Sequence, residues 1–384
     1  MNNIIFLGCT QNYGYQFSAA NTKVEFLAKG LKELGDHCTI HNGIIGTAQI
    51  AKKDIKQNSF VGSIITYPKK GNQFISWILN LPQLSEDLKS CYKKGFNNYI
   101  ILEAPDYHIY LLYVILAKIL KYRIAVISHE WLPTISSTHP IRKPAAFLYT
   151  FTFGYFADTI LPISEYIIKK IQRFKKPYIK IPITAEFNQL TSKRANVEKY
   201  FLYCVYAAYT RVIFQIIDAF TKYKTESTSN NSKLILILAG SQEHILAIQN
   251  YINKNELQKE ITIKSKIPYS TLVDLYSNAQ ALIIPLDPDN KQDEARFSQK
   301  IAEYLSSGSP IISNNVGEIK HYFTDKKDII LCDYDVNGFI DAFKWVSNHP
   351  TEAKQIGANG FYLGKKEFDY RVLAQRLHNF LKEI

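Results

Sequence analysis

Residues 296–317 read RFSQKIAEYLSSGSPIISNNVG, and this stretch decides how the second half of the chain is expected to fold. It follows an apolar strand pattern at 281–285. Ser298 is a good N-cap for a helix that Gly308 ends, and a second strand pattern follows at 310–312. The stretch therefore predicts a loop-to-helix junction at the carboxyl end of a parallel strand. Open α/β sheets bind ligands at this edge, and a helix N-terminus there favours an anion.

Lys300 and Glu303 lie three residues apart on one face of this expected helix. The lysine could meet a phosphate, and the carboxylate could accept hydrogen bonds from a sugar diol. An ordinary i,i+3 pair on a solvated helix surface is the other interpretation of the same spacing.

The stretch resembles the donor site of retaining glycosyltransferases of family 4 (group 1), which have the GT-B fold. The matching positions are Lys300, Glu303, Tyr304, Leu305, Gly308, Pro310, Ile311, Ile312 and Gly317. Many members carry two glutamates eight residues apart. Here Ala295 occupies the first of these positions, and Glu294 lies one residue off register.

Strand-like and helix-like segments alternate through both halves of the chain, which is typical of doubly wound parallel α/β sheets. The resemblance implies two Rossmann-like domains that face each other across a cleft. We expect an acceptor-side domain at residues 1–185, a polar linker at 186–199 and a nucleotide-sugar domain at 200–365. The last helix, within 366–384, is expected to cross back to the first domain.

Two positions in the first domain are candidates for the cleft. Gly14 lies in a polar loop after the first strand, and this loop resembles the glycine loop of GT-B enzymes, although a plain surface loop fits it equally well. His129 directly follows an apolar strand pattern. The resemblance implies that His129 contacts the donor sugar near the reacting carbon, whereas a capping or core histidine is the other interpretation.

Arg211 falls where the family has a lysine before the first helix of the second domain, and its forked guanidinium suits a diphosphate. The family's Gly-Arg pair upstream of this position is missing. The resemblance implies that His129, Arg211 and Lys300 are catalytic. It places Gly14, Arg211, Gly240, Ser298, Gln299, Lys300 and Glu303 around the nucleotide sugar.

Sugar transfer needs charge stabilisation on the departing nucleotide diphosphate, which Arg211, Lys300 and helix N-termini can supply without a metal. The sequence has no Asp-x-Asp motif after a strand and no compact His/Cys cluster, so neither a metal nor a cofactor is expected. No carboxylate of the first domain stands out as a nucleophile. The resemblance therefore implies retention by front-face attack, with the donor phosphate taking the acceptor's proton.

The net charge of +12 over 384 residues favours an anionic partner, either a nucleotide sugar or an anionic membrane surface. Aromatic residues are not interleaved with arginines as in a nucleic-acid platform, so no nucleic acid is expected. A basic helix after Ser164 carries Lys169, Lys170, Arg173, Lys175 and Lys176. It could contact a bilayer or a lipid-linked acceptor, or it could simply present a solvated basic face.

The five cysteines are scattered, there is no apolar run of about eighteen residues, and the first residues lack a signal-peptide pattern. We therefore expect a cytoplasmic protein, either soluble or peripheral on the inner face of the cell membrane.

The resulting hypothesis is a metal-independent hexosyltransferase of bacterial surface polysaccharide synthesis. It would pass a sugar from a nucleotide-diphosphate sugar, such as a UDP-sugar, to a saccharide acceptor, free or lipid-linked. One alternative is an inactive GT-B partner of another transferase, which the missing Gly-Arg pair and Ala295 favour. Another is a nucleotide-sugar epimerase, whose acid and base groups the sequence does not assemble.

Overall fold

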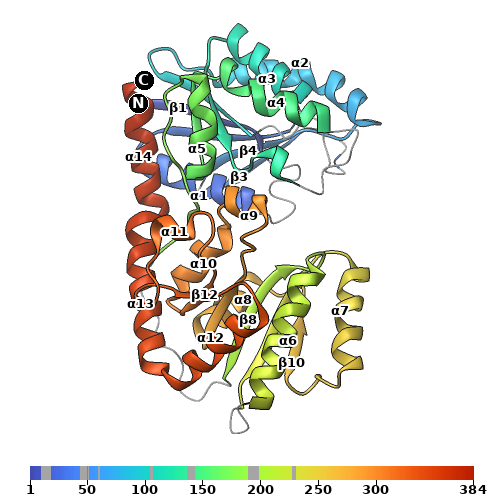
Figure 1. The fold of residues 1–384 in the computed structure, drawn as a ribbon. Helices are drawn as coiled ribbons and strands as arrows, with labels where there is room; N and C mark the ends of the chain where they lie inside the picture. Colours follow the sequence, from blue (N-terminus) through green and yellow to red (C-terminus); the bar gives the residue numbers. More distant parts are fainter. Residues whose placement is uncertain are drawn as a thin grey trace. The chain divides into compact units, whose positions relative to one another are not determined.

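The structure is a computed structural model that describes residues 1–9, 19–43, 50, 52–58, 61–103, 107–135, 143–188, 199–226 and 231–384. The chain divides into two α/β units (Figure 1). The first comprises Met1–Glu186, Ala295–Gln299 and Glu367–Ile384, and the second comprises Phe187–Glu294 and Lys300–Lys366. The expected α/β class, with one mainly parallel sheet in each half, is confirmed.

The first unit contains a seven-stranded sheet in the order β3-β4-β2-β1-β5-β6-β7. Its strands are β1 (Asn2–Cys9), β2 (His37–Asn42), β3 (Asp54–Asn58), β4 (Gly62–Thr66), β5 (Asn97–Leu102), β6 (Arg123–Ser128) and β7 (Thr159–Pro162). Every pair is parallel except β3 with β4. The sequence analysis missed β3 because this edge strand reads DIKQN, with little apolar signal and mostly exposed side chains.

Helices follow most of these strands, as parallel crossovers require. They are α1 (Ala19–Glu33), α2 (Gln73–Cys91), α3 (Tyr107–Ile119), α4 (Lys143–Phe156) and α5 (Glu165–Ile171), with short 3₁₀ turns at Leu132–Thr134 and Gln172–Phe174. Apolar residues of α1 and of the central strands form the buried core of this unit.

The C-terminal helix α14 (Tyr370–Glu383) also belongs to the first unit. Its Leu373, Leu377 and Leu381 are fully buried in the same core as β1 and α1. The hydroxyl of Tyr99 in β5 donates to the carbonyl of Leu381 over 2.9 Å, which fixes the end of the helix to the sheet.

The second unit contains a six-stranded parallel sheet in the order β10-β9-β8-β11-β12-β13. Its strands are β8 (Tyr200–Tyr206), β9 (Lys233–Ala239), β10 (Ile261–Lys264), β11 (Ala281–Ile284), β12 (Ile311–Ser313) and β13 (Ile330–Leu331). Its helices are α6 (Thr210–Glu226), α7 (Gln242–Lys254), α8 (Tyr269–Asn278), α9 (Lys291–Ala295), α10 (Gln299–Ser307), α11 (Ile319–Tyr322), α12 (Val336–Asn348) and α13 (Pro350–Glu367). The last residue of α9, the first of α10 and the last of α13 belong to the first unit.

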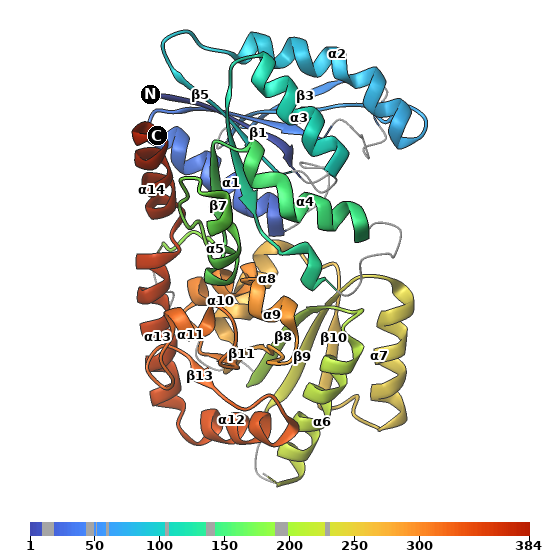
Figure 2. The same ribbon diagram turned by 45° about the horizontal axis from the view of Figure 1, so that its top comes forward.

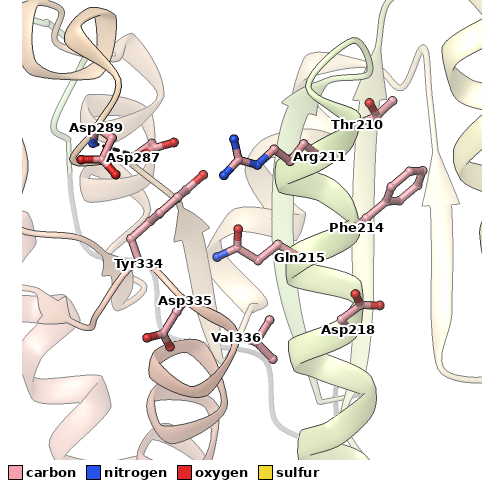
Figure 3. A pocket seen from close by; sticks show the side chains of 10 residues that line it. All are labelled: Thr210, Arg211, Phe214, Gln215, Asp218, Asp287, Asp289, Tyr334, Asp335 and Val336. Atoms are coloured by element: carbon pink, nitrogen blue, oxygen red, sulfur yellow. Dashed lines mark hydrogen bonds between the residues drawn. The ribbon is translucent and has the colours of Figure 1, made fainter.

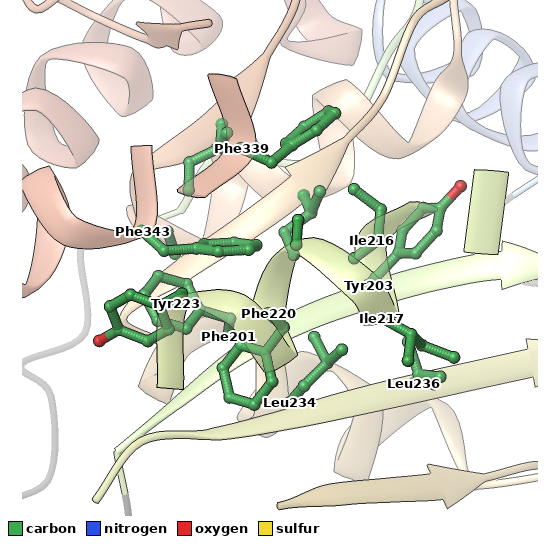
Figure 4. Packing of buried hydrophobic residues seen from close by; sticks show 14 of the residues in the cluster. Phe201, Tyr203, Ile216, Ile217, Phe220, Tyr223, Leu234, Leu236, Phe339 and Phe343 are labelled. Atoms are coloured by element: carbon green, nitrogen blue, oxygen red, sulfur yellow. The ribbon is translucent and has the colours of Figure 1, made fainter. Parts of the chain in front are cut away.

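Aromatic rings from β8, α6 and α12 fill the core of the second unit (Figure 4). The ring of Phe343 in α12 lies 4.7 Å from that of Phe201 and within 6 Å of those of Phe220 and Tyr223, measured between centroids. All four side chains are fully buried. This contact holds two helices against the strand that leads to the carboxyl edge of the sheet.

Replacement of Phe343 by alanine should lower the stability of the second unit by about 3–5 kcal/mol, because a large buried ring leaves a cavity. Amide hydrogen exchange on β8 and β9 should accelerate accordingly. The matched control is Tyr362→Ala, whose side chain is 62% exposed and should cost less than about 0.5 kcal/mol. Unchanged exchange on β8 in Phe343→Ala would contradict this account of the core.

Candidate functional site

The N-terminus of α10 lies at the carboxyl edge of the second sheet. β11 leads through α9 into α10, and β12 follows. β11 is parallel to both of its neighbours, β8 and β12. Because α10 follows a central strand of a parallel sheet, its free N–H groups and its dipole present partial positive charge at the edge where such sheets bind ligands.

Lys300 and Glu303 lie one turn apart in α10, where Lys300 is half-buried and Glu303 is buried. Glu303 is only 8% exposed, so it does not belong to a solvated surface pair. Burial raises the pKa of Glu303, and the charge of Lys300 opposes this rise. Burial acts to lower the pKa of Lys300, but Cys204 and Glu303 outweigh it and the pKa is raised. The site therefore keeps a charged ammonium group beside a partly desolvated carboxyl group.

Tyr304 fixes this part of α10 to the sheet. Its hydroxyl accepts the backbone N–H of Cys204 in β8 over 3.1 Å, and its ring packs edge to face on Tyr276 at 4.8 Å. Because Tyr304 is fully buried, it positions the helix that carries Lys300 and Glu303.

Glu294, the acidic residue one place off the family register, binds the loop that contains Gly317. Its carboxylate accepts the N–H of Gly317 over 3.0 Å and the ammonium group of Lys320 over 2.6 Å. Burial opposes ionisation of Glu294, but these hydrogen bonds lower its pKa. Gly317 has φ +57°, and a Cβ there would come within 2.6 Å of the Asp293 carbonyl, so only glycine fits this approach.

The segment just before Lys300 makes hydrogen bonds within the first unit. The side-chain amide of Gln299 accepts from the N–H of Thr184 and donates to its carbonyl. The carbonyl of Ala295 accepts the hydroxyl of Ser164 over 2.6 Å. Ser298 is partly exposed and directly precedes α10. The amide of Gln299 thus serves a backbone contact, while Ser298 stays accessible at the helix start.

Arg211 lies in a cavity of about 730 Å³ within the second unit (Figure 3). It is exposed in the first turn of α6, and its guanidinium points across the cavity towards Asp287 and Tyr334. Burial, with help from Asp287, raises the pKa of Tyr334 to about 12, and Arg211 opposes the rise. Four of the described residues in the wall are aspartates: Asp218, Asp287, Asp289 and Asp335. An anion in this cavity would therefore be favoured only next to Arg211.

Of the two glycines predicted to contact the nucleotide sugar, Gly240 lies among the described residues. Gly240 follows β9, and the next residue, Ser241, caps α7 by accepting the N–H of His244 over 3.4 Å. The turn at Gly240 thus leads into a helix N-terminus at the carboxyl end of β9. Gly14 lies outside the described residues.

His129 lies at the carboxyl edge of the first sheet, directly after β6. Its Nε2 is 3.6 Å from Oε1 of Glu103, beyond hydrogen-bonding distance, and its side chain is 21% exposed. Among the described residues, neither His129 Nε2 nor Glu103 Oε2 has a hydrogen-bond partner. Burial, together with the nearby charge of Lys23, lowers the pKa of His129 well below 6.5, so the imidazole is neutral at pH 7.

Glu103, which is partly exposed, and the buried Lys23 complete a cluster of titratable groups around His129. Burial raises the pKa of Glu103 to about 7, with Lys23 opposing the rise. Burial lowers the pKa of Lys23 to about 7, with Glu103 opposing the fall. The ammonium group of Lys23 also donates to the carbonyl of Ile181 over 2.6 Å.

The sequence analysis did not identify Glu103 or Lys23. Glu103 directly follows β5, just as His129 follows β6, so its place at a strand end was a usable signal. A Cβ at Gly8 would come within 2.7 Å of the Glu103 carbonyl, and glycine there allows this close approach. Lys23 lies inside α1, and only the tertiary structure brings it to the cluster.

The basic helix after Ser164 is short. Ile167, Ile168 and Ile171 of α5 are buried against the sheet, and Phe174 beyond it is buried as well. The lysines Lys169, Lys170 and Lys175 face solvent. This arrangement fits the interpretation of a solvated basic face whose apolar side belongs to the core.

Among the described residues, no group of three or more His, Cys, Asp or Glu side chains is arranged to hold a metal ion. None of the described helices combines the length and the apolar character needed to cross a membrane.

Replacing Lys23 by methionine should raise the pKa of His129 towards 6.5, because a positive charge that disfavours the imidazolium is removed while burial remains. Histidine NMR titration, with the signal assigned by its loss in His129→Ala, measures the shift. The control is Lys32→Met, an exposed position of the same helix, which should leave this pKa unchanged. A pKa that stays fixed or falls in Lys23→Met would refute the coupling.

Much of the second half of the chain matches a known family. Residues 187–361 match the family described as Glycosyl transferases group 1. Over 176 residues the chain is 24% identical to alpha-1,3/1,6-mannosyltransferase ALG2 of Dictyostelium discoideum, a match that covers 44% of this chain and 42% of that protein. The match therefore spans less than half of that relative's length.

Solved structures resemble the whole chain. Sucrose-phosphate synthase from Thermosynechococcus elongatus has a TM-score of 0.75 at 15% identity, covering 100% of this chain and 99% of that one. HepE of Anabaena in complex with UDP has a TM-score of 0.72 at 10% identity, with both chains covered completely. The UDP-forming α,α-trehalose-phosphate synthase from Burkholderia xenovorans has a TM-score of 0.71 at 11% identity, covering 98% and 99%. At these identities the likeness establishes the fold, and together with the group 1 domain at residues 187–361 it supports a glycosyltransferase with the GT-B fold.

Proposed function

We propose that this protein is a retaining glycosyltransferase of the family 4 type that transfers a hexose from a UDP-sugar to a saccharide acceptor. The observation that carries the proposal is the buried carboxyl group of Glu303, one turn from the half-buried Lys300 at the head of α10, inside the region that matches the group 1 family. HepE, which shares the fold, is described in complex with UDP and with UDP-glucose. That likeness makes UDP the first nucleotide to test.

In this proposal the donor is held mainly by side chains at the carboxyl edge of the second sheet. Lys300, with the N-terminus of α10, neutralises the diphosphate, and ionised Glu303 accepts hydrogen bonds from the ribose hydroxyls. Arg211 adds a second cation. Gly240, Ser298, Gln299 at the start of α10 and Gly14 are proposed as further contacts of the nucleotide sugar. The charge on the leaving diphosphate is then stabilised by the protein itself, without a metal.

His129 is proposed to act in turnover as a neutral imidazole. A group that stays neutral at pH 7 can exchange hydrogen bonds with a sugar hydroxyl without adding charge. Its Nε2 has no hydrogen-bond partner among the described residues, and the carboxyl group of Glu103 lies 3.6 Å away. Retention would follow from front-face attack, with the donor phosphate accepting the proton of the incoming hydroxyl.

The acceptor is proposed to be a saccharide, free or lipid-linked, in the synthesis of a bacterial surface polysaccharide. Cys38, Cys91, Cys204 and Cys332 are free thiols, which fits a reducing, cytoplasmic location. The mannosyl and sucrose or trehalose chemistry named for the similar proteins makes hexoses the first sugars to test.

One rival keeps a specific observation in its favour. Glu294 is engaged by Gly317 and Lys320, and Ala295 stands in the register of the family's first glutamate. An inactive GT-B partner of another transferase would share these features. Binding of UDP without release of UDP from any UDP-hexose, in the presence of acceptors, would favour that rival.

Glu303→Gln should weaken UDP binding at least about tenfold, because a charge-assisted hydrogen bond contributes about 1.5–3 kcal/mol. A thermal-shift titration of the wild-type chain with UDP measures this, since ligand at about a hundred times its Kd stabilises by about 2.7 kcal/mol. The matched control is Glu352→Gln at an exposed position of α13. Equal UDP affinity in Glu303→Gln and the control would remove Glu303 from the donor site.

His129→Ala should reduce turnover about 10²–10³-fold while leaving the melting temperature and UDP affinity close to those of the wild type, because the loss falls on transition-state contacts. Release of UDP from a UDP-hexose measures the rate. A fully active variant would show that His129 has no catalytic part.

A further inference from the structure

The helices α2, α3 and α4 lie side by side and form one layer on the first sheet (Figure 2). The ring of Trp77 in α2 packs on that of His108 in α3 at 6.1 Å. Tyr110 of α3 packs on Tyr149 of α4 at 5.2 Å and donates its hydroxyl to the Phe153 carbonyl over 2.6 Å. The outer surfaces of the three helices therefore form one continuous face, called here the α2–α3–α4 face.

This face is unusually apolar. Nine of the twenty large hydrophobic side chains that are exposed among the described residues lie on these three helices. They are Ile75, Ile78 and Leu79 of α2, Ile115 and Ile119 of α3, and Phe147, Leu148, Tyr155 and Phe156 of α4. Scattered exposed hydrophobics are normal, but such a concentration on adjacent helices marks an interaction surface.

The exposed side chains are additional to those that bind the helices to the sheet. In α3 the buried face already contains Tyr110, Tyr113 and Leu116, while Ile115 and Ile119, one turn apart, point to the other side. A helix that is apolar all round requires an apolar environment on both faces. Within the described residues nothing covers the outer side chains, which are up to 69% exposed.

The charges around the α2–α3–α4 face are mainly positive. The α3 and α4 helices contain no acidic residue, and each has one lysine, Lys118 and Lys143. Lys69 and Lys70 are exposed just before α2, and Arg173 lies over the Phe151 ring of α4 at 4.2 Å. The α2 helix contains Glu86, Asp87 and Lys89. Asp87 pairs with Lys53, and the charge of Lys118 is matched by that of Asp158. The positive charge of the face therefore rests on Lys69, Lys70, Lys143 and Arg173.

We propose that the α2–α3–α4 face docks onto an anionic lipid bilayer. Exposed Ile, Leu, Phe and Tyr side chains would enter the interfacial region, and the flanking lysines and Arg173 would meet the anionic headgroups. If the face instead bound a protein partner, binding of the chain to vesicles would not depend on anionic headgroups. This inference extends the proposed lipid-linked acceptor, but it rests on the surface itself and needs no turnover.

The proposal changes which helix contacts lipid. The sequence left two interpretations of the basic helix after Ser164, a contact with a bilayer or lipid-linked acceptor and a solvated basic face. In the structure, the apolar residues of α5 are buried in the core, so its surface is charged and has little exposed apolar area. The exposed apolar area lies on α2, α3 and α4.

Vesicle flotation of the full chain tests the docking. At low salt the chain should float with phosphatidylglycerol-containing phosphatidylcholine vesicles and bind pure phosphatidylcholine vesicles more weakly. The double variant Phe147→Ser/Leu148→Ser should lose at least about tenfold in affinity, because two large side chains no longer leave water. The matched control, Tyr269→Ser/Val273→Ser, removes two exposed apolar side chains of α8 and should bind like the wild type.

Three outcomes would overturn the docking: no binding to anionic vesicles, equal loss in both double variants, or equal binding to both kinds of vesicle. The melting temperature of each variant verifies its fold, and Ile115→Gln/Ile119→Gln provides a second variant on α3. UDP binding measured on the same preparations separates the two proposals. Vesicle binding without UDP binding would support the docking proposal and refute the donor site. UDP binding without vesicle binding would support the donor site and refute the docking proposal.

Discussion

The burial of ionisable groups at the carboxyl edges of two parallel sheets is the constraint on which the rest of the account depends. Removing a carboxyl or ammonium group from water costs free energy unless it is paired or changes its protonation. Glu303 beside Lys300 in one unit, and Glu103 beside Lys23 in the other, are groups of this kind. Strongly perturbed pKa values cluster at functional sites.

In each unit, packing contacts hold in place the helices and strands that carry these groups. In the second unit Tyr304 ties α10 to β8, and the rings around Phe343 hold α6 and α12 on the same strand. In the first unit the C-terminal helix α14 completes the core beneath β1 and α1. The charged groups therefore lie on rigid elements, which is what precise placement of a small ligand requires.

Much of the fold could be predicted because buried parallel strands and their helices leave strong apolar patterns. The junction before α10 was predicted from Ser298, Gly308 and two short apolar runs, and the structure contains it. The edge strand β3 was missed because an exposed strand has no such pattern. The site was harder to predict, because sequence spacing identifies neighbours along one helix but not across elements. Lys300 and Glu303 were identified together, whereas Glu103 and Lys23, 80 residues apart, are brought together only by folding.

Hydrogen–deuterium exchange of the full chain with and without UDP tests the central claim most directly, because it reports where a nucleotide binds. The account predicts UDP-dependent protection of the α10 N-terminus, residues 299–303, and of the segment that joins β8 to α6. These amides would donate to, or lie beside, the bound diphosphate and ribose. Protection confined to other segments, or no protection at saturating UDP, would contradict the assignment of Lys300 and Glu303 to a donor site.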